Sequence, residues 1–157
     1  VILAKRDLSY NKMEDILAFV KQGKTLILQP TPKWADFLYQ QKILTQAITD
    51  WGSQQEGFWY GNGWGYISRY IGAQTLQGQG AIGTNSWEAN SDPQGFYPLK
   101  SNFPCQVHGL WLARHNKLRV LLADIEYGEG KIILNSAYDF DQNSPLANHI
   151  FYNMIIE

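Results

Sequence analysis

Residues 1–28 decide the fold class, and they read VILAKRDLSYNKMEDILAFVKQGKTLIL. Val1–Ala4 and Thr25–Leu28 are short apolar runs, typical of strands that are buried on both faces of a sheet. The segment between them has the spacing of a helix whose buried residues are Met13, Ile16, Leu17 and Val20. Gly23 is suited to end that helix in a left-handed conformation. Strand, helix and strand form a βαβ unit, and its right-handed crossover makes the two strands parallel.

A second regular region lies near the C-terminal end. Val107–Ala113, Leu118–Tyr127 and Lys131–Leu134 have strand-like patterns, and Gly128-Glu129-Gly130 supplies a short turn between the last two. These two runs therefore predict a β-hairpin. Ser144 caps a closing helix with Pro145 at its first position, where the missing N–H has no cost. The expected buried stripe of that helix is Leu146, Ile150, Phe151, Met154 and Ile155.

The length and composition narrow the class of protein. A chain of 157 residues fits one domain, so we assign residues 1–157 to a single α/β domain. The net charge is −1 with scattered Lys and Arg, which argues against a nucleic-acid partner. No apolar run approaches the roughly 20 residues that a membrane span requires. Cys105 is the single cysteine, so neither an internal disulfide nor a multi-cysteine zinc site is expected.

The middle of the chain, residues 51–104, has no clear periodicity. Before this region, Pro30 and Pro32 end the second strand. A helix is expected to follow over about Trp34 to Leu44. A long irregular stretch is typical of an insertion or a functional surface. Aromatic rings stack on the C–H faces of sugars while amides and carboxylates bind hydroxyls, which makes six residues candidates for carbohydrate binding: Trp59, Tyr60, Asn62, Trp64, Trp87 and Glu88. The alternative is that these rings fill a core or an interdomain contact.

Both ends of the chain carry motifs of a known family. Ile16–Leu28 contains Val20-Lys21-Gln22-Gly23-Lys24-Thr25-Leu26, and Glu126–Leu134 contains Gly128-Glu129-Gly130 before the closing helix at Ser144. These stretches resemble the Val-x-x-Gly-Gly-Thr-Leu strand and the Gly-x-Gly hairpin of class I glutamine-amidotransferase-like domains, with Lys24 in place of the second glycine. The resemblance implies a flavodoxin-like, amidotransferase-like three-layer sheet. Degenerate versions of this domain occur in bacterial glycoside hydrolases, including β-galactosidase-like enzymes of family two.

The residues that carry amidotransferase chemistry are missing from the pattern. The family places its nucleophilic cysteine on a glycine-flanked strand-to-helix turn, where the sulfur faces the oxyanion donors. Cys105 has no glycine beside it and no helix after it. Tyr138-Asp139-Phe140-Asp141 stands where the family has a His-x-Glu pair. The fold is therefore implied and the chemistry is not, and we assign no catalytic residue.

Three other groups of reactive side chains are candidates for catalysis or metal binding. Cys105 and His108 could form a thiolate–imidazole pair, although free cysteine is commonly a small buried residue. His108, His115 and His149 share no spacing that suits a metal, so we expect no metal and no cofactor. Glycosidases need two carboxylates, and the nearest pairs in sequence are Asp139 with Asp141 and Glu126 with Glu129. Both pairs lie at loop or hairpin edges, so the acid and nucleophile of a sugar hydrolase are expected on another domain.

The sequence thus leads to three hypotheses about function. The first is a non-catalytic accessory or interface domain of a carbohydrate-active enzyme, cut from a longer chain, whose partners are the other domains of that chain. The second is a stand-alone carbohydrate-binding module that uses the aromatic segment. The third is a cysteine-dependent amidohydrolase built on Cys105. The parent's class favours a periplasmic or secreted location, and the oligomeric state stays open.

Overall fold

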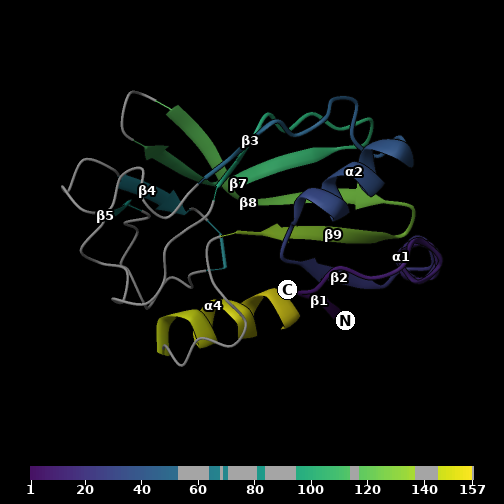
Figure 1. Cartoon of the computed structure of the whole chain (residues 1–157). Helices are drawn as coiled ribbons and strands as arrows, with labels where there is room; N and C mark the ends of the chain where they lie inside the picture. The colour runs from purple at the N-terminus through teal and green to yellow at the C-terminus, as the bar shows by residue number, and fades with distance from the viewer. Residues whose placement is uncertain are drawn as a thin grey trace.

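The protein has an α/β fold built on a mixed β-sheet (Figure 1). The computed structural model describes residues 1–52, 64–67, 69–70, 81–83, 95–113, 117–136 and 145–156. Within them the strand order along the sheet is β1-β2-β9-β8-β7-β4-β5, and β6 joins β3 to β8 beside this path. Three helices of eight or more residues are described: α1, α2 and α4.

The parallel core is the predicted βαβ unit with one further strand. β1 (Ile2–Ala4) pairs in parallel with β2 (Thr25–Leu28), and α1 (Tyr10–Lys21) connects them. β9 (Gly130–Asn135) then pairs in parallel with the other side of β2, with Ile133 opposite Ile27. The predicted parallel opening is therefore confirmed, and a C-terminal strand completes it.

The end of α1 and the tip of the β8–β9 hairpin fit together through glycine. Gly23 has φ +98°, and its N–H donates to the Val20 carbonyl at 2.9 Å, as in a Schellman cap. Glu129 N–H donates to the Lys21 carbonyl at 3.0 Å, which seats the hairpin on the helix end. A Cβ on Gly130 would lie 2.2 Å from the Val20 carbonyl oxygen. The Gly-x-Gly motif is therefore required by this backbone contact.

Helix α2 (Pro32–Gln40) begins and ends earlier than predicted. The Thr31 side chain caps its start by accepting from the Trp34 N–H at 3.2 Å, with Pro32 at the first position. Lys42 has φ +57°, and the Ile43 N–H donates to the Leu38 carbonyl at 3.0 Å. The helix cannot continue to Leu44 because this left-handed residue closes it.

The antiparallel part of the sheet draws on the region predicted to be irregular. β8 (Lys117–Tyr127) pairs with β9 in the expected hairpin and with β7 (Cys105–Ala113) on its other side. The remaining strands are β3 (Asp50–Trp51), β4 (Trp64–Ile67), β5 (Ala81–Gly83) and β6 (Phe96–Tyr97). β4, β5 and β6 lie within residues 51–104, which therefore contribute strands to the same sheet.

The sheet buries apolar side chains on both faces. One cluster joins α1 and α2 to the strands, and its members include Met13, Leu17, Leu26, Trp34, Phe37, Ile125 and Ile132. Ile27 and Ile133 are buried outside this cluster, as are Ile150 and Met154 of α4 (Pro145–Ile156). Because neighbouring residues of a strand point to opposite faces, we infer that α4 covers the second face.

The buried stripe of α4 differs from the prediction. Ile150 and Met154 are buried as expected, but Ile155 is exposed and Phe151 is half-buried. Asn153 is buried instead, because it binds the backbone of the polar cluster described below. The side chain of Leu146 lies outside the described residues.

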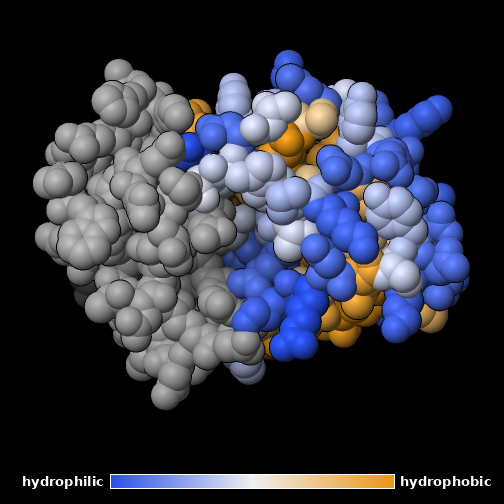
Figure 2. Space-filling model, in the orientation of Figure 1, coloured by the Kyte–Doolittle hydropathy of each residue, from blue (hydrophilic) through white to orange (hydrophobic). Residues whose placement is uncertain are grey.

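In the described part of the chain, no helix is long and apolar enough to cross a membrane. Figure 2 shows that hydrophilic residues predominate on the described surface in this view, with smaller hydrophobic patches between them.

Candidate functional site

The site begins at an irregularity in the β7–β8 pairing. The register shifts between Val107 and Gly109, so His108 is the extra residue on β7. Bulges of this kind redirect a side chain and are frequent beside functional sites. A Cβ on Gly109 would lie 2.8 Å from the Leu122 Cβ, so this close approach of the two strands requires glycine. The bulge lets the His108 ring reach Asp124 on β8.

Asp124 is the centre of a buried polar cluster. The residue is only 7% exposed, and three side chains lie within hydrogen-bond distance of its Oδ2. Tyr70 Oη donates at 2.7 Å, Arg69 Nη1 lies at 3.1 Å and His108 Nε2 at 3.2 Å. A His108 tautomer with its proton on Nε2 would donate this last bond. A buried carboxylate needs such partners, because unpaired burial of its charge is strongly unfavourable.

Tyr70 is held in an unusual backbone conformation. Its φ is +68°, in the left-handed region that bulky residues rarely occupy. The Asn153 side chain donates to the Tyr70 carbonyl at 2.7 Å, and the ring meets the His108 ring edge-on at a centroid distance of 6.1 Å. Arg69 and Lys131 also lie over the Tyr70 ring, at 5.0 and 5.7 Å from its centroid. A left-handed backbone conformation of this kind costs about 1–3 kcal/mol, and these contacts hold Tyr70 in it.

The Asp124–His108 pair is largely enclosed by the fold. A general base must come within hydrogen-bond reach of its substrate. His108 is 5% exposed, and its ring is enclosed by Tyr70 and Asp124. Arg69, at 37% side-chain exposure, is the member of this cluster that reaches solvent. The pair therefore joins β7 to β8 and contacts Arg69.

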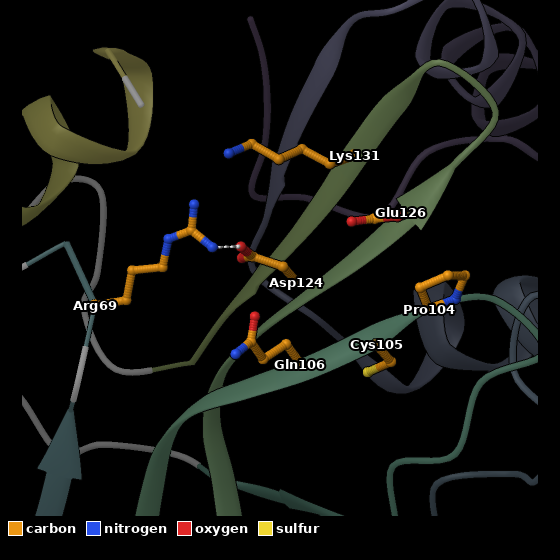
Figure 3. A pocket seen from close by; sticks show the side chains of 7 residues that line it. All are labelled: Arg69, Pro104, Cys105, Gln106, Asp124, Glu126 and Lys131. Atoms are coloured by element: carbon orange, nitrogen blue, oxygen red, sulfur yellow. Dashed lines mark hydrogen bonds and ion pairs between the residues drawn. The ribbon is translucent and has the colours of Figure 1, made fainter.

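An open pocket of about 380 Å³ lies beside this cluster. Figure 3 shows Arg69, Gln106, Glu126 and Lys131 pointing towards the same space next to Asp124, from the segment after β4 and from strands β7, β8 and β9. Glu126 is exposed and lies opposite Lys131 in the β8–β9 register. The pocket thus combines two cations, two carboxylates and one amide.

Cys105 lies at the rim of this pocket but has no catalytic setting. It is the first residue of β7 and pairs with Ile125, so it belongs to an extended strand and not to a strand-to-helix turn. Desolvation by the surrounding protein raises the pKa of the Cys105 thiol, and the negative charge of Asp124 raises it further. The residue remains exposed. His108 binds Asp124, and within the described part of the chain no imidazole is bonded to the thiol.

Most of the residues predicted to bind sugar fall outside the described residues. These are Trp59, Tyr60, Asn62, Trp87 and Glu88; Trp64 lies in β4, but its side chain is not described. Asp139 and Asp141 are also outside the described ranges, whereas Glu126 and Glu129 are exposed residues of the β8–β9 hairpin. Among the described side chains, no three His, Cys, Asp or Glu converge as metal ligands.

Sequence reasoning missed Arg69 and Asp124, and it included Tyr70 only among the aromatic residues of the middle segment. The available signal was Asp124 itself, a charged residue in the otherwise apolar run Val120–Ile125, because buried charges require partners.

Comparison of the chain with known protein families and with curated proteins finds no match.

Proposed function

We propose that this chain is a non-catalytic accessory or interface domain of a carbohydrate-active enzyme, built on a degenerate amidotransferase-like version of the flavodoxin-like fold. The element order supports the proposal, because a parallel βαβ unit, a glycine-tipped hairpin and a closing helix are what the resemblance implies. The parent enzyme of such a domain is expected to be a glycoside hydrolase.

The observation that carries the proposal is the position of Cys105. An amidotransferase needs a nucleophilic thiolate, an adjacent base and oxyanion donors at one sharp turn. Cys105 lies in a strand, its pKa is raised, and the nearby imidazole of His108 binds Asp124. These features oppose thiolate formation, so the geometry favours an accessory domain over a cysteine-dependent amidohydrolase.

The surface supports an interface role as well. Val1 and Leu3 on the β1 side are more than half exposed, and so are Tyr152 and Ile156 on α4. Leu3 lies on the same face of the sheet as Ile27, because the two residues are partners in the β1–β2 register. Exposed apolar side chains of this size are suited to contact with another domain. We infer that the β1 edge and α4 are available for contact with the rest of the enzyme.

The test is an activity assay on the isolated, folded chain. Ammonia release from glutamine and turnover of aryl glycosides should both stay at the rate of buffer alone. Cys105→Ser and Glu126→Gln should leave these values unchanged. Glutamine hydrolysis that disappears in Cys105→Ser, or glycoside turnover that disappears in Glu126→Gln or Asp139→Asn, would overturn the proposal.

A further inference from the structure

The pocket beside Asp124 has the size and position of a binding site. Its volume of about 380 Å³ falls within the range of small-molecule pockets. A second pocket of about 380 Å³ adjoins it, because Glu126 and Lys131 line both. Gly23, Thr25 and the glycine hairpin form the rest of the second pocket. Together the two pockets give space for a ligand of more than one ring-sized unit.

The polar side chains of this surface follow from the strand register. Thr25 lies opposite Lys131, and Lys131 lies opposite Glu126, so three polar residues form one row across β2, β9 and β8. Ile27 and Ile133 form the next row on the same face, and both are buried. On this face of the sheet, the polar row of Thr25, Lys131 and Glu126 therefore lies next to a buried apolar row and lines the pockets at its end.

The charges of the first pocket balance. Arg69 and Lys131 bring two positive charges, and Asp124 and Glu126 bring two negative charges. A phosphate or an ammonium ligand would leave one pair of charges opposed to it at short range. A neutral ligand with many hydroxyls meets both signs, since each hydroxyl donates one hydrogen bond and accepts others. The charge pattern thus favours a neutral polyhydroxyl compound.

Asp124 also retains an unfilled acceptor. Its Oδ2 lies within hydrogen-bond distance of three side chains, but Oδ1 is buried and has no hydrogen-bond partner among the described residues. Buried polar atoms without partners are rare in proteins and costly. Arg69 binds the other oxygen of this carboxylate at 3.1 Å, and the Arg69 side chain is 37% exposed. Asp124 lines the pocket, so a ligand hydroxyl bound there would be a suitable donor to Oδ1.

We propose that this pocket binds a neutral carbohydrate. Asp124 and Glu126 accept hydrogen bonds from its hydroxyls. Arg69, Lys131 and Gln106 donate hydrogen bonds to the hydroxyl oxygens. The proposal rests on the proposed role in a carbohydrate-active enzyme and places the sugar on the sheet instead of on the aromatic segment. It concerns binding alone and includes no covalent step.

The test is a titration of the isotope-labelled chain followed by ¹H–¹⁵N NMR, with lactose and cellobiose as neutral probes. Inorganic phosphate and glucosamine serve as the anionic and cationic probes. We expect the neutral sugars to shift the amide signals of Gln106, Glu126 and Lys131. Glu126→Gln should weaken their binding about tenfold, because hydrogen bonds to charged groups are the stronger ones. Glu14→Gln, the same change at an exposed position on α1, should leave binding unchanged.

Several outcomes would overturn the proposal. They are no shift with either sugar, tighter binding of phosphate or glucosamine, or sugar binding that changes tryptophan fluorescence but is unaffected by Glu126→Gln. In each case a chain that shows no turnover of glutamine or glycosides would still fit an accessory domain. Hydrolytic activity of the isolated chain would instead remove the proposed function, whatever the pocket binds.

Discussion

Tyr70 connects three elements that are far apart in sequence. Its hydroxyl binds Asp124 on β8, its carbonyl accepts from Asn153 on α4, and its ring packs against His108 on β7. It is also a left-handed residue, so its conformation is stable only while these contacts are made. The position of Arg69, and with it one wall of the pocket, depends on this residue.

Replacement of the Tyr70 hydroxyl should therefore destabilise the fold. Tyr70→Phe removes one donor from a buried carboxylate, and we expect the free energy of unfolding to fall by about 1–3 kcal/mol. Urea denaturation followed by circular dichroism measures this change. Tyr10→Phe, which removes the hydroxyl of a tyrosine that is 43% exposed on α1, is the matched control and should change the value by less than about 0.5 kcal/mol. Equal values for the two variants would show that the Tyr70 hydroxyl does not hold the cluster.

The buried cluster marks the limit of sequence reasoning at this scale. Asp124 could be singled out as a charge in an apolar strand, but its partner Arg69 lies 55 residues earlier, in a stretch with no periodicity. Nothing local to either residue specifies that pairing. The bulge at His108 is equally invisible, because it depends on how β7 and β8 align.

The β8–β9 hairpin shows what local pattern can predict at the scale of elements. The turn Gly128-Glu129-Gly130 indicated a hairpin, and the structure confirms it. The reason for two glycines lies elsewhere, in the end of α1. A Cβ on Gly128 would lie 2.7 Å from the Lys21 Cα, and one on Gly130 would lie 2.2 Å from the Val20 carbonyl oxygen. The hairpin and the helix can therefore meet only without side chains at these positions.

Gly130→Ala should separate the hairpin tip from α1. Because the added methyl group meets backbone atoms that cannot move aside alone, we expect a loss of about 3 kcal/mol or more in the free energy of unfolding. Glu129→Ala, on the exposed residue between the two glycines, is the control and should cost less than about 0.5 kcal/mol. Chemical denaturation of both variants decides the matter, and a Gly130→Ala variant as stable as the control would refute the proposed contact.

For the whole molecule, the sequence predicted the parts that local contacts define. The parallel opening unit, the hairpin and the closing helix are all present. It did not predict that β9 would insert between β2 and β8, or where in residues 51–104 the strands β4, β5 and β6 would form. Strand order depends on contacts between distant segments, and the pattern of a short strand is the same wherever it pairs.

The proposed function of the whole molecule requires that its sheet carries no thiol chemistry. In an active amidotransferase the nucleophile forms its thiolate at neutral pH because the site lowers its pKa. In this chain, desolvation and Asp124 raise the pKa of Cys105 above its ordinary value of 9.0. The thiol should therefore stay protonated at pH 7. Because the folded protein favours the protonated thiol, its contribution to folding stability should be lost only as the pH rises above 9.

Mass spectrometry of Cys105 tests this claim most directly. The folded chain is incubated at pH 7 with a diazoketone analogue of glutamine, and in parallel with iodoacetamide across a range of pH. We expect no adduct from the glutamine analogue, and alkylation by iodoacetamide whose rate increases chiefly above pH 9, which also shows that the exposed thiol is accessible. A glutamine-analogue adduct on Cys105 at pH 7, or an alkylation midpoint below the ordinary thiol value, would contradict the account.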